Sequence, residues 1–260
     1  MNNMKKLIYL GIFFSFACAG TYAQNISLGL RGGISIPNLT AGSGNQNPLN
    51  TGYSSRQGPE AAVFAEFKFS NLFSLQPMIE YSSQGGKKDG LQAFTTPDEL
   101  KAMYPPGQAP AYLYANYNSE AKLNYLLLPV LAKAGWMLSH SPFRIYVDAG
   151  PFVGLLVSAH QVTGGQSPFY ADPAGQQPLP GGPQSFDANS NVRNSLHRVN
   201  AGVEGNLGLS YTTGKSSVFI EGGGNYGLLN IQKNAADGKN ETGAAIATIG
   251  YSYGFGNKRK

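Results

Sequence analysis

The segment from Ala61 to Ser83 constrains the fold of this chain more than any other part of the sequence. It contains two runs in which apolar and polar residues alternate, 61–69 and 73–82, separated by three residues. A period of two indicates β-strands, because successive side chains point to opposite faces. On the apolar face, aromatic residues lie near the turn and at the far end, and charged residues lie on the other face. This pattern is typical of strands between lipid and a polar lumen.

The rest of the chain repeats this unit. Similar alternation predicts six more strands, at about 25–37, 117–135, 143–159, 197–212, 216–232 and 241–255. In the segment 117–135 a leucine-rich run breaks the alternation, and we predict a β-bulge near Pro129 that returns Lys133 to the polar face.

The connections between the predicted strands alternate in length. Three of them are long and rich in Gly, Pro, Asn and Ser, at 38–57, 85–116 and 160–196. Outer-membrane barrels have this asymmetry, with short periplasmic turns and long extracellular loops. Closure also removes the apolar edges that an open sheet would expose. We therefore predict an all-β fold, an eight-stranded antiparallel up-and-down transmembrane β-barrel.

The composition agrees with this fold and argues against a nucleic-acid-binding protein. The chain has 34 Gly, 15 Tyr and 14 Phe, and only 13% of its residues are charged. Part of the net charge of +5 comes from lysines and an arginine near the two ends, and no basic cluster lies in the interior of the sequence. We therefore expect no nucleic-acid partner.

Residues 1–23 have the pattern of a secretory signal peptide. Two lysines precede the apolar run from Leu7 to Ala19, which is too short to cross a bilayer, and small residues favour cleavage after Ala23. The outer-membrane barrel domain then spans residues 24–260. A short membrane anchor and lipidation at Cys18 are alternatives. Cys18 is the single cysteine, so cleavage would leave no thiol for a disulfide, for catalysis or for a metal site.

The polar faces of the predicted strands carry equal numbers of cations and anions. We predict that these side chains form an ion-pair network inside the lumen, because isolated charges there would cost several kcal/mol. The predicted set is Arg31, Glu66, Lys68, Glu80, Glu120, Lys122, Lys133, Arg144, Asp148, Arg198, Glu204 and Glu221. An eight-stranded barrel has room only for side chains, so no pore is expected. A proton or ion path is the functional alternative.

The apolar faces carry aromatic residues that we interpret as membrane-interface girdles. These residues are Phe69, Phe73, Tyr81, Tyr211, Tyr226, Tyr251, Tyr253 and Phe255.

The sequence carries little evidence for catalysis. Its histidines are His140, His160 and His197, and Ser195 would share a strand face with His197. Phosphate loops, zinc-ligand spacings and paired carboxylates do not occur in the sequence. We predict a protein without catalytic residues, cofactor or metal. A lipid-modifying enzyme and a small-ligand-binding barrel remain alternatives.

Four segments resemble the PorT-like outer-membrane β-barrel family of Bacteroidetes, proteins with an outer membrane protein β-barrel domain. They are the signal ending Ala23-Gln24, LGLRGG at 28–33, NYLLLPVLAK at 124–133 and YGLLNI at 226–231. The resemblance covers essentially the whole mature chain and implies a barrel in the bacterial outer membrane. The namesake of the family is linked to gliding and to a protein-secretion machinery.

Together these observations predict a structural or scaffolding barrel that interacts through its extracellular loops. The expected partners are outer-membrane lipid, the barrel-assembly machinery during insertion, and an envelope protein or surface glycan at the loops.

Overall fold

The computed structural model describes residues 25–41, 48–102, 104–234 and 237–255. The predicted signal peptide, Cys18 and the basic C-terminal residues therefore lie outside the described part of the chain. Among the residues described, there is no helix with the length and apolar character needed to cross a membrane.

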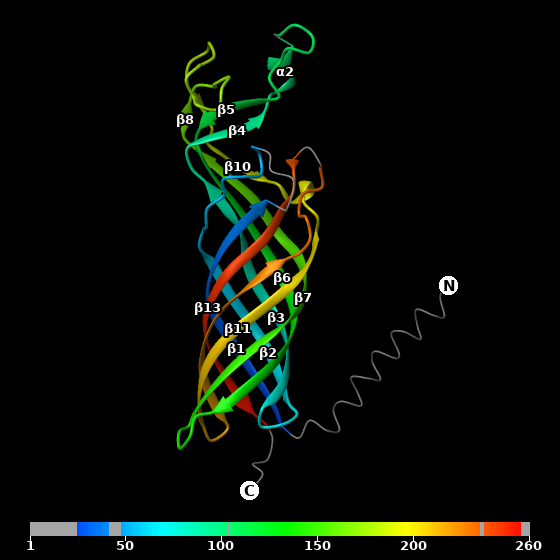
Figure 1. Ribbon diagram of the computed structural model, residues 1–260, viewed down its shortest axis with the longest axis vertical. Helices are drawn as coiled ribbons and strands as arrows, with labels where there is room; N and C mark the ends of the chain where they lie inside the picture. The colour runs from blue at the N-terminus through cyan, green and yellow to red at the C-terminus, as the bar shows by residue number, and fades with distance from the viewer. Residues whose placement is uncertain (1–24, 42–47, 103, 235–236, 256–260) are drawn as a thin grey trace, which may run out of the picture.

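Eight long strands form a closed antiparallel ring (Figure 1). In ring order they are β1 (Asn25–Ala41), β2 (Gly58–Lys68), β3 (Phe73–Lys88), β6 (Asn118–Met137), β7 (Phe143–Gly164), β11 (Val199–Thr213), β12 (Ser216–Gly227) and β13 (Asn240–Gly254). The pairing of β13 with β1 closes the ring: Leu30 lies opposite Tyr251 on one side and opposite Val63 of β2 on the other. The predicted eight-stranded antiparallel barrel is confirmed.

Short turns join the strands at one end of the barrel, and long connections join them at the other (Figure 1). In the turn between β2 and β3, the hydroxyl of Ser70 accepts hydrogen bonds from the backbone N–H groups of Leu72 and Phe73. The turn between β11 and β12 contains Gly214 with a φ of +62°, a conformation that glycine adopts without strain. The short-turn end is the periplasmic end of such a barrel, and the long connections are extracellular.

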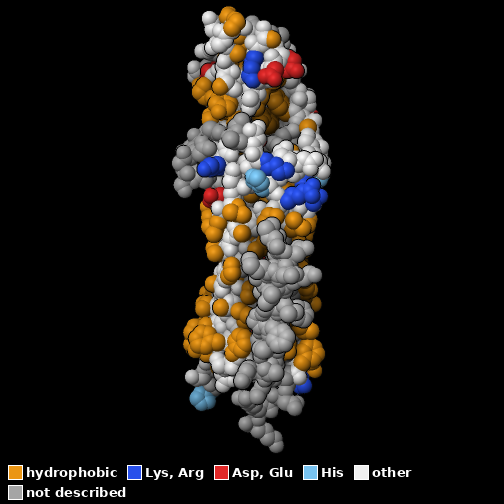
Figure 2. Space-filling model, turned by 90° about the vertical axis from the view of Figure 1, so that its right-hand side faces the viewer, with side chains coloured by type: hydrophobic (Ala, Val, Ile, Leu, Met, Phe, Trp, Pro, Cys, Tyr) orange, Lys and Arg blue, Asp and Glu red, His pale blue; other side chains and the backbone are white. Residues whose placement is uncertain are grey.

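The outer wall of the barrel is apolar and its interior holds the charges. Val147 and Ile249 are 43% and 61% exposed, respectively, whereas Glu66 and Glu204 are buried. Figure 2 shows a belt of hydrophobic side chains on the face that it presents. The eight aromatic residues predicted as girdles all lie on the outside, seven of them exposed and Tyr81 partly so. This arrangement suits a wall in contact with lipid.

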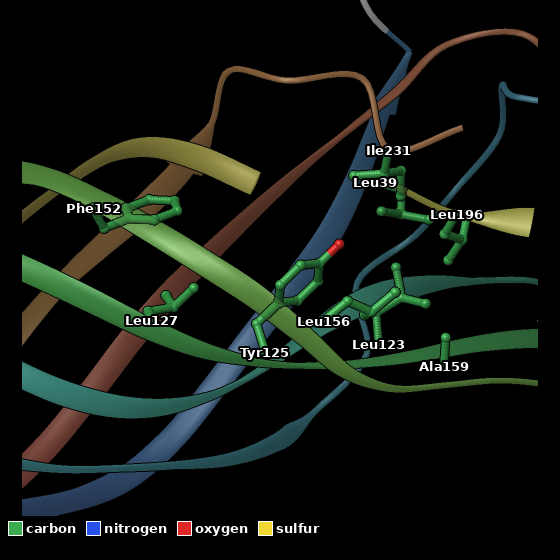
Figure 3. Close-up of a cluster of buried hydrophobic side chains, with 9 residues drawn as sticks. All are labelled: Leu39, Leu123, Tyr125, Leu127, Phe152, Leu156, Ala159, Leu196 and Ile231. Carbon is green, nitrogen blue, oxygen red and sulfur yellow. The ribbon is translucent and has the colours of Figure 1, made fainter. Parts of the chain in front are cut away.

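The lumen is filled in layers along the barrel axis. An upper apolar cluster joins β6 and β7 to the end of β1 and to two connecting segments (Figure 3). It consists of Leu39, Leu123, Tyr125, Leu127, Phe152, Leu156, Ala159, Leu196 and Ile231. A lower apolar cluster consists of Ala62, Phe64, Met78, Leu131 and Phe219. Along β2, the order Glu60, Phe64, Glu66 places carboxylates on both sides of the lower cluster.

The predicted bulge near Pro129 is wrong. In β6 the odd residues from Leu123 to Gly135 are all buried without a change of phase. The irregularity lies in β7 instead, where Asn124 pairs with Ser158 and Tyr125 pairs with Leu156. The extra residue in β7 lets Leu156 and Ala159 both point inward. The leucine run in β6 continues the alternation, because leucines occupy both faces: one face contacts lipid and the other the upper cluster.

The long connections are more structured than predicted, and the barrel strands extend into them. The segment 85–116 contains the end of β3, β4 (Leu91–Thr95), α2 (Asp98–Lys101) and β5 (Tyr112–Asn116). The segment 160–196 contains the end of β7, β8 (Gln166–Ser167), β9 (Gln184–Ser185), β10 (Ala188–Asn191) and the turn η1 (Arg193–Ser195). The glycine and proline content correctly predicted connections between the barrel strands. It did not predict the short strand pairs β4–β5 and β8–β9 within them. Conversely, β12 ends at Gly227, five residues before the predicted boundary.

Candidate functional site

The centre of the lumen is organised around one arginine. Arg31 of β1 donates through Nη2 to Glu80 of β3 at 2.6 Å and to Glu204 of β11 at 2.8 Å. Its Nη1 donates to Glu221 of β12 at 3.0 Å, and Glu60 of β2 lies 4.0 Å from Nη2. Arg31 is only 2% exposed. One guanidinium therefore links carboxylates from several sides of the ring, with the short charge-assisted bonds that Arg forms with such groups.

A lysine extends this network towards the periplasmic end. Lys133 of β6 donates to Gln76 at 2.6 Å, and its Nζ lies 3.6 Å from Asp148 and 3.7 Å from Glu221. The same ammonium lies 4.2 Å from the centre of the Tyr146 ring, which is the geometry of a cation–π contact. The hydroxyl of Tyr146 in turn donates to Glu221 at 2.9 Å. Glu221 thus connects the arginine and the lysine.

Carboxylates outnumber cations in this central layer. Arg31 and Lys133 lie among five acidic side chains, namely Glu60, Glu80, Asp148, Glu204 and Glu221. Both carboxylate oxygens of Glu60 are buried without a hydrogen-bond donor. The sequence predicted equal numbers of opposite charges in the lumen, but alternation assigns a residue to a face and not to a height along the barrel. The predicted lumen set did not include Glu60, although Glu60 lies on the same face of β2 as Glu66.

Other predicted lumen charges lie at the periplasmic mouth. Glu66 accepts a hydrogen bond from Ser74 at 2.7 Å and lies 3.6 Å from Arg144. Lys68 joins these residues around a small polar cavity of about 40 Å³. This volume suffices for water but not for a larger ligand.

Three predicted lumen charges lie outside the lumen. Glu120 and Lys122 lie on the outward side of β6 at its extracellular end, 3.3 Å from each other, and Glu120 accepts a hydrogen bond from Arg56 at 2.7 Å. Arg198 is exposed and precedes β11. The prediction placed Glu120 and Lys122 inside because it assumed a change of phase in β6 that does not occur. It placed Arg198 inside because it began the strand at residue 197, whereas β11 begins at Val199.

Among the described residues, no histidine side chain forms a hydrogen bond or ion pair with a serine or a carboxylate. Nδ1 of His160 lies 3.1 Å from the side-chain oxygen of Asn189. His140 occupies a periplasmic turn with a φ of 55°, and Ser195 and His197 are both exposed. Within residues 25–41, 48–102, 104–234 and 237–255, no three His, Cys, Asp or Glu side chains are grouped so as to hold a metal ion.

The extracellular connections form a cap above the barrel, which we define as residues 89–117 and 165–187 (Figure 1). Four aromatic rings form its centre. Phe186 stacks on Tyr117 at 4.6 Å and contacts Phe169 and Phe94 at 5.8 and 6.3 Å. These rings are partly buried, and burial raises the pKa of Tyr117. The two parts of the cap are also joined by paired backbone hydrogen bonds between Tyr114 and Tyr170.

Acidic and aromatic residues order the connections near the cap. The carboxylate of Asp172 accepts hydrogen bonds from the backbone N–H groups of Ala174, Gln176 and Gln177. Lost hydration acts to raise the pKa of Asp172, but these bonds outweigh it and hold the pKa below its usual value. In the segment before β2, burial raises the pKa of Tyr53 to about 12. The ammonium of Lys88 lies 4.3 Å from the centre of the Tyr53 ring.

A closed ring of strands with an apolar outer wall and an ionic interior defines an integral outer-membrane β-barrel. The chain belongs to the outer membrane protein beta-barrel domain family, whose model matches residues 22–233. The protein is thus located in the bacterial outer membrane, as predicted.

Several solved barrels are similar to this chain. Neisserial surface protein A is 13% identical, over 87% of this chain and 96% of its own, with a TM-score of 0.38. OprG from Pseudomonas aeruginosa is 10% identical over 89% and 96%, with a TM-score of 0.35. Ail of Yersinia pestis, solved with the heparin analogue sucrose octasulfate, is 10% identical over 88% and 99%, with a TM-score of 0.33. No curated protein matches the sequence significantly.

Proposed function

We propose that this outer-membrane protein is a filled, non-catalytic barrel that holds an ordered extracellular cap in position for a partner outside the cell. The observation that carries the proposal is the aromatic centre of the cap. The finer assignment, a role in protein secretion or gliding, rests on the resemblance to PorT-like proteins. An envelope protein or a surface glycan is the proposed partner.

The contents of the lumen support a scaffold rather than a channel. Two apolar clusters and the Arg31 network occupy the interior, and the described cavity at the periplasmic mouth holds only about 40 Å³. Ions crossing the barrel would have to break the buried bonds of Arg31 to Glu80, Glu204 and Glu221. Breaking a buried ion pair costs about 3–5 kcal/mol.

The order of the cap supports an interaction role. Long connections in compact domains are uncommon unless they have a function, and exposed loops on a rigid scaffold are where binding residues concentrate. Here the connections are paired in β4–β5 and in β8–β9, and their rings contact each other. Each such aromatic contact contributes about 0.5–1.5 kcal/mol. A cap ordered before binding loses less entropy when a partner binds.

The proposed function is tested by crosslinking in native outer membranes. In the test variant, residues 168–183 between β8 and β9 are replaced by a Gly-Ser linker, which leaves the barrel strands intact. In the control variant, residues 138–142 of a periplasmic turn are replaced in the same way. We expect a crosslinked envelope protein or glycan with the wild type and with the control, and its loss with the cap variant. The same crosslinks in all three proteins would contradict the proposal.

Conductance tests the absence of a channel separately. Reconstituted wild-type protein should show no stable open state in planar bilayers. A steady conductance from the folded wild-type protein would contradict the filled-lumen account, because it would require an open ion path past Arg31. For the finer proposal, deletion of the gene should impair protein secretion or gliding, and unaffected secretion and gliding would refute it.

A further inference from the structure

The extracellular rim carries a group of basic residues immediately above the apolar wall. Two segments lie side by side there: His197 donates its backbone N–H to Ile231 at 2.8 Å, and Lys233 donates its own to Ser195 at 3.2 Å. These two segments contain four basic residues, which we call the rim patch: Arg193, His197, Arg198 and Lys233. Figure 2 shows Lys, Arg and His side chains gathered directly above the hydrophobic belt on the face that it presents.

The rim patch has no acidic residue in its own segments. The sequence has no Asp or Glu between Ala188 and Val203 or between Gly222 and Asn234. A nearby acidic residue, Glu241, accepts a hydrogen bond from Tyr226. Arg198 and Lys233 are exposed, so their charges face the surroundings of the barrel, and His197 is exposed beside them. The two segments therefore carry a net positive charge, with Asp187 and Asp237 just outside them in the sequence.

Exposed apolar residues lie next to the rim patch in the sequence. Val199, Leu228 and Leu229 are exposed and apolar, and they are adjacent in sequence to Arg198 or at most five residues from Lys233. Cations next to exposed leucines are placed at the level of lipid headgroups, where arginine and lysine side chains extend towards phosphate. A soluble anion would make no favourable contact with these exposed apolar residues.

Below the rim patch, β7, β11 and β12 form an open groove in the apolar wall. The groove has a volume of about 540 Å³ and is lined by Pro151, Val203, Gly205, Gly224 and Tyr226, among others. Val203 is five residues from Arg198 in sequence, which corresponds to about 17 Å along an extended strand. That separation is comparable to the length of a fatty acyl chain.

We propose that the rim patch and this groove form a binding site for a phosphate-bearing glycolipid of the outer leaflet. The guanidinium of Arg198 and the ammonium of Lys233 bind the headgroup phosphate, and one acyl chain lies in the groove along β11 and β12. This site goes beyond the proposed function, because it lies on the wall and rim of the barrel and not on the cap.

The test measures lipid binding by native mass spectrometry of the full mature protein in neutral detergent. The probes are phosphorylated lipid A, the same lipid A after phosphatase treatment, and inorganic pyrophosphate. The headgroup variant is R198Q/K233Q, which leaves Arg193 and its hydrogen bond to the carbonyl of Leu156 in place. The control, K101Q/K215Q, removes the same charge from the cap and from a periplasmic turn.

The groove has its own matched pair of variants. A Cβ atom at Gly205 would meet only ordinary contacts, 3.6 Å from the carbonyl of Asp148 and 3.7 Å from Ala149, so G205L adds apolar volume at the groove from a position that tolerates a Cβ. A Cβ atom at Gly222 would meet nothing within 4 Å, and Gly222 does not line the groove. G222L is therefore the control for added apolar volume on the same wall. Heat-modifiable gel mobility verifies that each variant folds.

We expect phosphorylated lipid A to bind the wild type and both controls within twofold of each other. Each lost cation should weaken binding by about fivefold, so R198Q/K233Q should weaken it by about 25-fold. Dephosphorylated lipid A should bind as weakly as this variant does, and G205L should weaken binding severalfold.

Equal binding of the two lipid A forms, or equal losses in R198Q/K233Q and K101Q/K215Q, would overturn the headgroup site. Competition by pyrophosphate at concentrations equal to the lipid would identify a free-phosphate site and overturn the lipid assignment. Unchanged binding by G205L would overturn the role of the groove.

Discussion

The central layer of the lumen and the extracellular rim contain the same kinds of residues in opposite surroundings. Arg31 is enclosed by carboxylates from four other strands, whereas Arg198 is exposed beside apolar wall residues. In the sequence, the alternation of apolar and polar residues assigns both arginines to the inward face of the barrel. The difference is one of height: Arg31 lies within the ring, and Arg198 lies just beyond the start of β11. A buried arginine holds strands together, and an exposed one is available to an anion.

The largest expected effect comes from exchanging the two arginines for methionine in turn. R31M leaves carboxylates buried without their cation, and we expect it to lower the free energy of unfolding by about 3–5 kcal/mol. R198M removes an exposed charge and should change it by less than about 0.5 kcal/mol. Urea unfolding of the protein in lipid vesicles measures both values. Similar losses for the two variants would remove the distinction between centre and rim.

A smaller effect is expected from a methyl group added inside and outside the wall. A side chain at Gly208 would lie 2.1 Å from the Tyr146 ring, which is buried and bonded to Glu221. G208A should therefore destabilise the barrel by about 1–3 kcal/mol. G222A, where nothing lies within 4 Å, should be neutral or slightly stabilising. Unfolding midpoints in the same urea series provide the comparison, and a neutral G208A would show that the lumen is loosely filled.

Removing a carboxylate should raise the free energy of unfolding in the central layer and lower it at the extracellular rim. Glu60 lies in the layer where five carboxylates surround two cations, and neither of its oxygens accepts a hydrogen bond. E60Q should stabilise the barrel by about 1 kcal/mol, because it removes one of the buried carboxylates that outnumber the cations of this layer. E120Q breaks the partly exposed pair with Arg56 and should cost at most about 1 kcal/mol. The comparison fails if E60Q is the more destabilising variant.

The smallest effect concerns the order of the cap as a function of pH. The pKa of Asp172 is depressed in the folded loop, so its contribution is present above the usual aspartate pKa of about 3.9 and is lost as the pH falls through the lower folded value. Protection factors of the Gln176 and Gln177 amides should therefore hold at pH 5 and fall in stronger acid. In D172N the protection factors of these amides should be reduced at pH 5 as well as in stronger acid. Hydrogen exchange of the cap amides measures this, and equal protection in D172N would exclude the carboxylate as the cause.

The ring of strands could be predicted from the sequence because lipid and lumen impose a strict alternation. Residues such as Val147 against Asp148, or Ile249 against Thr248, differ so clearly in polarity that their faces follow directly. The same signal fails where both faces are apolar. In β6, Leu126 contacts lipid while Leu127 belongs to the upper cluster, and the sequence does not distinguish them.

The site was predictable only in part, because contacts across the lumen depend on the stagger of the strands. Alternation placed Arg31, Glu80, Glu204 and Glu221 on inward faces but did not indicate that they meet at one height. It also did not identify Glu60 or the aromatic centre of the cap. Phe94, Phe169 and Phe186 come from two connections far apart in sequence, and no local pattern joins them.

The inverted polarity of the wall is tested most directly by nuclear Overhauser effects between acyl chains and labelled methyl groups of the protein in lipid nanodiscs. The methyl groups of Val147 and Ile249 should show strong effects from the acyl chains, and those of Leu127 and Leu131 should show none. Acyl-chain contacts at Leu127 and Leu131, with none at Val147 and Ile249, would contradict the barrel described above.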